Sequence, residues 1–105
     1  MREEILAMKP GPSLDELIQQ DIFKEKLFYG PPNYSTNISY AFLVNEKLRN
    51  NGLYITLVAG KDSYQASVYS LRYLIDIEEV ECATAEEAIC KVALLCVTND
   101  FITIT

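Results

Sequence analysis

Residues 84–97 read TAEEAICKVALLCV, and this segment decides the fold. Thr84 and Glu87 form a capping-box pattern, in which a hydroxyl and a carboxylate satisfy free amides at the start of a helix. Beyond Glu87 the segment has one polar residue, Lys91, so the predicted helix is apolar nearly all round. Such a helix must be covered on more than one side. It is therefore either the central helix of the domain or a helix whose outer side, at Leu94, is a subunit interface.

The segment before this helix alternates as strands do. Residues 53–58 and 64–69 each alternate with period two, and residues 59–63 (AGKDS) suit a hairpin loop between them. A third strand lies within residues 73–82. The parity of its apolar residues changes there, which predicts a bend or bulge near Glu78 and Glu79. The pattern thus predicts three antiparallel strands followed by a long helix.

The first half of the chain is predicted to be helical. Residues 2–8 form a short helix, and Ser13 with Glu16 forms a second capping-box pattern that opens the next helix. A third helix begins at Ser35 or Asn37, either of which can cap it. Its apolar face is expected to comprise Ile38, Ala41, Phe42 and Leu48. At the other end of the chain, residues 101–105 (FITIT) have the composition of an edge strand.

These elements predict an α+β fold, an α/β/α-type sandwich. It has two or three N-terminal helices, a three-stranded antiparallel sheet and a long C-terminal helix. The length of 105 residues suits a single domain over residues 1–105, and a hydrophobic fraction of 50% suffices for a core without metal or disulfide bonds. The three cysteines have no framework spacing, which is typical of free thiols in a reducing cytoplasm.

Charge argues against several classes of partner. The formal net charge is -6, and the nine lysines and arginines are scattered. Nucleic-acid binding depends on clustered basic residues, so we expect no nucleic-acid partner. The start of the sequence carries Glu3 and Glu4 and no long apolar run, and the longest apolar stretch, residues 92–97, is too short to cross a bilayer. We therefore expect no membrane association.

The sequence also lacks the usual groups of catalytic centres. It has no histidine, no Cys-x-x-Cys and no glycine-rich phosphate loop, so we predict no enzyme, no catalytic residues and no cofactor. Asp76, Glu78, Glu79 and Glu81 could in principle hold a hard cation. Alternate strand residues point to opposite faces, however, and no calcium-loop spacing accompanies them. We interpret them as a solvated strand edge and predict no metal site.

The strands offer the best candidate for a binding surface. Tyr54, Thr56, Gln65 and Tyr69 fall on the parity opposite to the aliphatic residues, together with Ser67. If the strands pair in register, these residues form a polar, aromatic sheet face suited to a ligand or protein partner. The alternative is that a helix or a second subunit covers this face.

Several stretches carry a resemblance to a known family. They are residues 1–11 (MREEILAMKPG), 14–18 (LDELI), 32–39 (PNYSTNIS), 45–48 (NEKL) and 84–90 (TAEEAIC). On these stretches the chain resembles the phage ABA sandwich domain family, small proteins of phages and prophages. It departs from the family at Phe42, where we expect tryptophan, and in the strand region. The resemblance implies a sandwich fold and a phage-encoded protein in the cytoplasm of a bacterial host. The family has no established activity, so no site residues are transferred.

Two hypotheses of function follow. The first is a non-enzymatic phage or prophage accessory protein that acts as a protein-interaction module and self-associates, for example as a homodimer. It would use the tyrosine-bearing sheet face or the outer side of the last helix at Leu94. The alternative is a small-ligand protein that binds or sequesters a nucleotide of host defence, for which Arg49, Lys61 and Arg72 are the basic residues predicted near the sheet.

Overall fold

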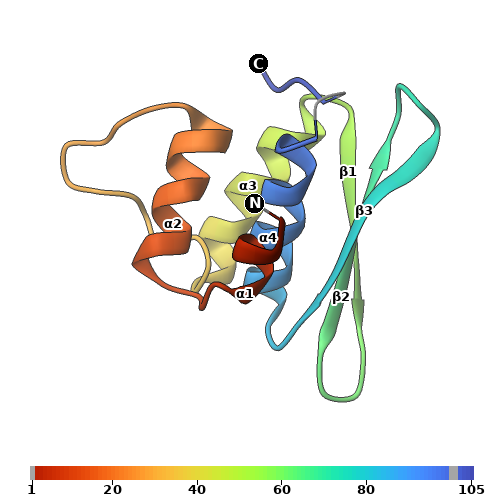
Figure 1. The fold of residues 1–105 in the computed structure, drawn as a ribbon, viewed down its shortest axis with the longest axis horizontal. Coiled ribbons are helices and arrows are strands. Elements are labelled where there is room, and N and C mark those ends of the chain that lie inside the picture. The colour runs from red at the N-terminus through yellow and green to blue at the C-terminus, as the bar shows by residue number, and fades with distance from the viewer. Residues whose placement is uncertain (1, 100–101) are drawn as a thin grey trace.

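The helices lie on one side of a three-stranded sheet in the computed structural model, which describes residues 2–99 and 102–105 (Figure 1). The elements are α1 (Arg2–Ala7), α2 (Pro12–Ile18), a π-helical turn η1 (Gln19–Phe23), α3 (Ile38–Arg49), β1 (Leu53–Ala59), β2 (Tyr64–Ser70), β3 (Ile75–Cys82) and α4 (Ala85–Val97). The predicted α+β sandwich, with its antiparallel sheet and C-terminal helix, is confirmed.

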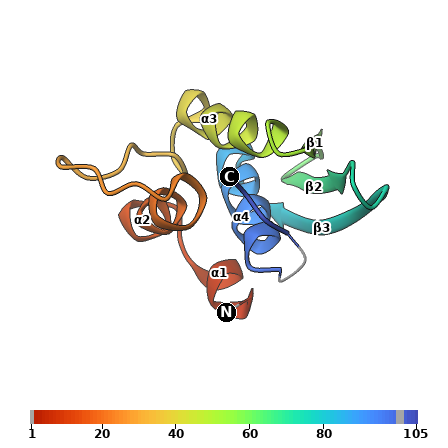
Figure 2. The same cartoon turned by 90° about the horizontal axis from the view of Figure 1, so that it is seen from above.

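Helix α4 occupies the centre of the molecule. Figure 2 shows α1, α2 and α3 around it and the sheet along its remaining side. Every residue of α4 from Ala88 to Cys96 is buried. Leu94 has no exposed surface, so the prediction that it belongs to a subunit interface is wrong. The physical reason is that three other helices and the sheet cover all sides of this nearly all-apolar helix.

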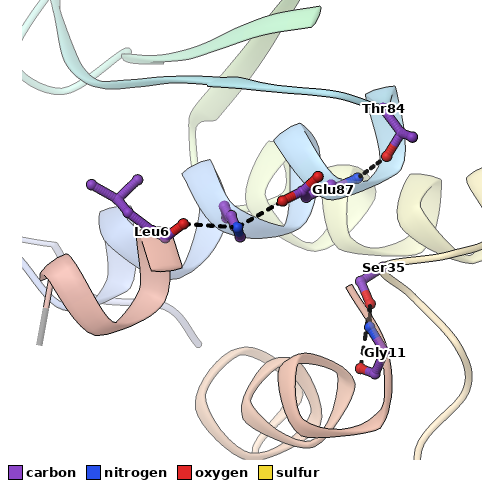
Figure 3. A network of polar contacts seen from close by, with 6 residues as sticks. Leu6, Gly11, Ser35, Thr84 and Glu87 are labelled. Atoms are coloured by element: carbon purple, nitrogen blue, oxygen red, sulfur yellow. Dashed lines mark hydrogen bonds and ion pairs between the residues drawn. The ribbon is translucent and has the colours of Figure 1, made fainter. Parts of the chain in front are cut away.

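The capping pattern of α4 is half confirmed. Thr84 Oγ1 accepts a hydrogen bond from the Glu87 backbone N–H at 3.2 Å (Figure 3). The Glu87 carboxylate does not return to Thr84 but accepts from Lys91 Nζ at 2.6 Å. Lys91 also donates to the main-chain oxygen of Leu6 at 3.0 Å and is only 3% exposed. This buried ammonium therefore ties α1 to α4.

The sheet has the order β1-β2-β3 with antiparallel pairs throughout. Val68 pairs with Glu78 and Tyr69 with Asp76, which leaves Ile77 as an extra residue on β3. The predicted bulge is thus confirmed, one residue before the expected position. On the side that faces the helices, the strands bury Leu53, Ala66, Val68 and Val80.

Helix α2 begins earlier than its capping pattern predicts. The N-cap is Gly11, at φ 145°, and Pro12 occupies the first helical turn, so the prediction that Ser13 caps this helix is wrong. Proline favours that position because its missing N–H needs no partner there. Ser35 stabilises the junction instead. Its hydroxyl accepts from Gly11 N at 2.9 Å and donates to Asp15 Oδ1 at 2.6 Å.

Helix α3 is capped by Asn37, whose side-chain oxygen accepts from Ser39 N at 2.9 Å. Its buried residues are Ala41, Val44 and Leu48. Ile38 and Phe42, which the predicted apolar face included, are 38% and 52% exposed. The buried stripe is narrower than the apolar stripe, and α3 therefore leaves apolar side chains at the surface.

The C-terminal segment packs without forming a strand. Ile104 is 4% exposed, and its main-chain oxygen accepts from Lys24 Nζ at 2.9 Å. Thr105 N donates to Asn51 Oδ1 at 2.9 Å. The predicted edge strand is therefore wrong for residues 102–105, because the side chains of Lys24 and Asn51 bind the backbone of this segment in place of a neighbouring strand. Residue 101 lies outside the described residues. No helix in residues 2–99 has the length and apolarity to span a bilayer.

Candidate interaction surface

The side of the sheet turned away from the helices forms one continuous surface, which we call the outer face. Cross-strand partners in an antiparallel sheet share a face, so the pairing register fixes its members. They are Tyr54, Thr56 and Val58 of β1, Gln65, Ser67 and Tyr69 of β2, and Asp76, Glu79 and Glu81 of β3. No helix of the described chain covers this face (Figure 2).

The structure brings four predicted site residues together on the outer face. Tyr54 pairs directly with Tyr69, and Thr56 pairs with Ser67. Gln65 lies two residues before Ser67 on β2 and pairs with Val58. Tyr54 is 41% exposed, so its ring is available to a partner. The fifth predicted residue, Leu94, lies in the core on the other side of the sheet.

The outer face changes in chemistry from one edge to the other. Its β1 edge has no charged side chain, and Val58 there is 53% exposed. Its β3 edge is an acidic margin of Asp76, Glu79 and Glu81. Gln65 Nε2 donates to Glu79 Oε1, and Ser63 Oγ donates to Glu81 Oε2 at 3.0 Å, which orients both carboxylates. A complementary partner would place apolar groups near β1 and basic groups near β3.

Val58 and the acidic margin belong to this surface but were not among the predicted site residues. The strand alternation contains the signal for Val58, since it shares the parity of Tyr54 and Thr56. The position of Asp76 depends on the bulge at Ile77, which reverses the parity of β3 at that point. Only the observed pairing shows that Asp76 lies opposite Tyr69.

The thiols are poor nucleophiles. Cys82, Cys90 and Cys96 are free. Burial, with a smaller contribution from the Glu87 carboxylate, raises the pKa of Cys82 to about 11. Burial also raises the pKa of Cys96 to about 12 and shifts the pKa of Cys90 upward. All three thiols are therefore protonated at neutral pH.

Metal ligands do not gather in the described residues. Within residues 2–99 and 102–105, no group of three or more cysteine, aspartate or glutamate side chains could hold an ion. The acidic margin is spread along β3, and two of its carboxylates, those of Glu79 and Glu81, are bonded to neighbouring side chains. In the part of the chain that the structure describes, these carboxylates form a surface and not a coordination site.

The three basic residues predicted near the sheet do not gather in one place. Arg49 pairs with Glu46 at 3.0 Å on α3. Arg72 lies over the Tyr73 ring, 5.5 Å from its centroid, in the turn after β2, whereas Lys61 lies in the hairpin before β2. The turn and the hairpin are at opposite ends of the sheet. These three side chains therefore form no common phosphate site.

Comparison with known proteins supports the resemblance of the sequence. Residues 3–94 match the family described as the phage ABA sandwich domain. The match extends from α1 into α4 and includes the whole sheet. No curated protein and no solved structure matches the chain.

Proposed function

We propose that this chain, which belongs to the phage ABA sandwich domain family, is a non-enzymatic accessory protein of a phage or prophage. It acts as a protein-interaction module in the cytoplasm of the bacterial host. The outer face of the sheet is its contact surface, and a protein is its partner.

One observation carries this proposal: the sheet has its helices on one side and leaves the outer face open (Figure 1). Tyrosine and uncharged polar residues are enriched where proteins meet, because a tyrosine buries a large ring and keeps a hydroxyl for hydrogen bonding. The Tyr54–Tyr69 pair supplies two such residues opposite each other on neighbouring strands. The acidic margin adds a charged border, which favours a partner with lysine or arginine at the matching position.

Comparative capture from infected bacterial cells tests the proposal. Tagged wild-type protein and a Tyr54→Ala, Tyr69→Ala variant are used as baits under the same conditions. The expected result is a partner protein that the wild type retains and the double variant loses. Tyr40→Ala is the matched control, because Tyr40 in α3 is 40% exposed, against 41% for Tyr54, and lies off the sheet.

The captured partner is then purified and titrated against each bait by calorimetry. We expect the double variant to bind at least about tenfold more weakly, since interface aromatic residues commonly carry more than about 1.4 kcal/mol each. Circular dichroism shows whether each variant is folded. Equal affinity of the folded double variant and the wild type would contradict the proposal.

A further inference from the structure

The backbone of β1 is hydrogen-bonded on one side only. β1 pairs with β2 alone in the described sheet. Gly60 N donates to Ser63 O at 2.8 Å, and Leu71 N donates to Gly52 O at 2.9 Å. Hydrogen-bonded and non-hydrogen-bonded pairs alternate along an antiparallel ladder, and the bonded residues that flank β1, Gly52 and Gly60, are both even-numbered. The even-numbered residues of β1 are therefore the ones that bond to β2. The groups that point away from the sheet are the N–H and C=O of Ile55, Leu57 and Ala59.

The two edges of the sheet differ in how they discourage pairing. β3 has a bulge at Ile77 and carries four carboxylates, and Arg2 of α1 donates to one of them, on Glu78. Charges and bulges are the usual protection of an edge strand. β1 (LYITLVA) has no charge, no proline and no bulge over its seven residues. Its backbone can therefore accept another strand.

Apolar side chains flank this edge on both faces. Leu57 points to the helical side, since it pairs with the buried Ala66, yet it is 38% exposed. Val58 points to the outer face and is 53% exposed. A strand added beside β1 would cover both side chains and extend the outer face next to Tyr54.

We propose that the partner of this module contributes one extended segment, which pairs with β1 as a fourth strand; this inference rests on the proposed interaction function. A second copy of the chain fits this edge less well than an isolated strand. A two-fold axis between two β1 strands would be perpendicular to the sheet and would keep all helices on the same side. Helix α3 packs beside β1 on that side (Figure 2), so a second copy would have to place its own α3 next to the first. An extended segment has no helix that must be placed on that side of the sheet.

The edge defines the chemistry of this segment. Side chains that point to the helical side meet Ile55 and Leu57, so they are apolar. Side chains on the outer face meet Tyr54, Thr56 and Val58, where uncharged or aromatic groups fit. The carboxylates lie two strands away, about 10 Å from β1, and the chain has a net charge of -6. The segment is therefore β-branched or apolar at its centre, and its flanks are uncharged or basic.

A displayed library of random seven-residue peptides is the probe. It is selected on the immobilised full chain and counter-selected on Leu57→Pro. Proline at this position removes an N–H that points to solvent and leaves the bonds to β2 intact. We expect enriched peptides with alternating apolar or β-branched residues. Their affinity, measured by fluorescence anisotropy, should fall about tenfold or more in Leu57→Pro and Leu57→Lys.

Controls separate edge pairing from other effects. Leu6→Lys introduces the same charge at a position of similar exposure, 42%, in α1, and should bind the peptides as the wild type does. Peptides N-methylated at alternate residues should lose binding when their donors to β1 are blocked. If circular dichroism shows that Leu57→Pro is unfolded, the comparison rests on Leu57→Lys, whose substituted side chain is already partly exposed.

Three outcomes would overturn the inference. They are a selection that enriches no peptide, enriched peptides that bind Leu57→Lys as tightly as the wild type, and a Thr56→Cys variant that forms a disulfide-linked dimer. The last result would show a second copy at this edge, since a two-fold pair centred on Thr56 places the two cysteines about 4.5 Å apart at Cα. Capture of the cellular partner distinguishes this failure from that of the proposed function. If Leu57→Lys keeps the partner and Tyr54→Ala, Tyr69→Ala loses it, edge pairing fails and the outer face remains the contact surface.

Discussion

Replacing Lys91 by methionine separates the charge of this buried side chain from its packing. Methionine keeps most of the aliphatic length but removes the ammonium that joins Glu87 at 2.6 Å and the Leu6 carbonyl at 3.0 Å. The side chains of Lys91 and Glu87 are 4% and 13% exposed. The substitution therefore leaves a nearly buried carboxylate without its cation and a carbonyl oxygen without its donor.

We expect this substitution to lower the free energy of unfolding by about 3 kcal/mol, as is typical when one partner of a buried ion pair is removed. A further Glu87→Gln substitution removes the uncompensated charge. The double variant should therefore recover about 1–2 kcal/mol, and the remaining loss reflects the unpaired Leu6 oxygen.

Urea unfolding at pH 7, followed by circular dichroism, measures each free energy. The same series in 1 M salt is the control, because a buried pair is screened much less than an exposed one. A Lys91→Met variant within about 0.5 kcal/mol of the wild type, or a double variant less stable than Lys91→Met, would refute the role of this ion pair in docking α1.

Three further predictions concern the core and its buried polar groups. Leu94→Ala should cost about 2–5 kcal/mol in urea unfolding, since the side chain is fully buried, and a loss below about 1 kcal/mol would contradict its place in the core. Asp15→Ala leaves the buried Ser35 N–H, now 2.8 Å from Asp15 Oδ1, without an acceptor and should cost about 1.5–3 kcal/mol by the same assay. The free energy of unfolding should be constant up to about pH 8 and should fall as the pH rises from about 9 through the pKa values of Cys82, about 11, and Cys96, about 12. The reason is that the unfolded chain releases these two thiol protons at a lower pH than the folded chain does. Each thiol contributes up to about 1.4 kcal/mol per pH unit, so Cys96→Ala should give a shallower alkaline slope, and an equal slope would rule out this cause.

The sheet and the last helix could be predicted because their patterns are local. Strand alternation placed Tyr54, Thr56 and Gln65 opposite to the aliphatic residues of their own strands, and the register then joined them across β1 and β2. The change of apolar parity in β3 predicted the bulge. In α4, nearly uniform apolarity required cover on several sides but could not show which elements supply it. Leu94 was open to both interpretations until the positions of α1, α2 and α3 were known.

The errors arise where tertiary contacts override local preference. Ser13 has the chemistry of an N-cap, yet Pro12 sets the helix start and Ser35 supplies the hydroxyl from a distant loop. The C-terminal residues have strand composition, but Lys24 binds the Ile104 carbonyl and holds the segment against the helices. Such partners are far apart in sequence, so no local pattern contains them.

Residue-resolved amide exchange of β1, measured by NMR with and without the captured partner, tests the central claim most directly. In the free protein the amides of Ile55, Leu57 and Ala59 should exchange rapidly, and those of Tyr54, Thr56 and Val58 slowly. Addition of the partner should protect the first group. Amides of Ile55, Leu57 and Ala59 that continue to exchange rapidly in the complex, while protection arises on α3 or in the loop between η1 and α3, would contradict the account.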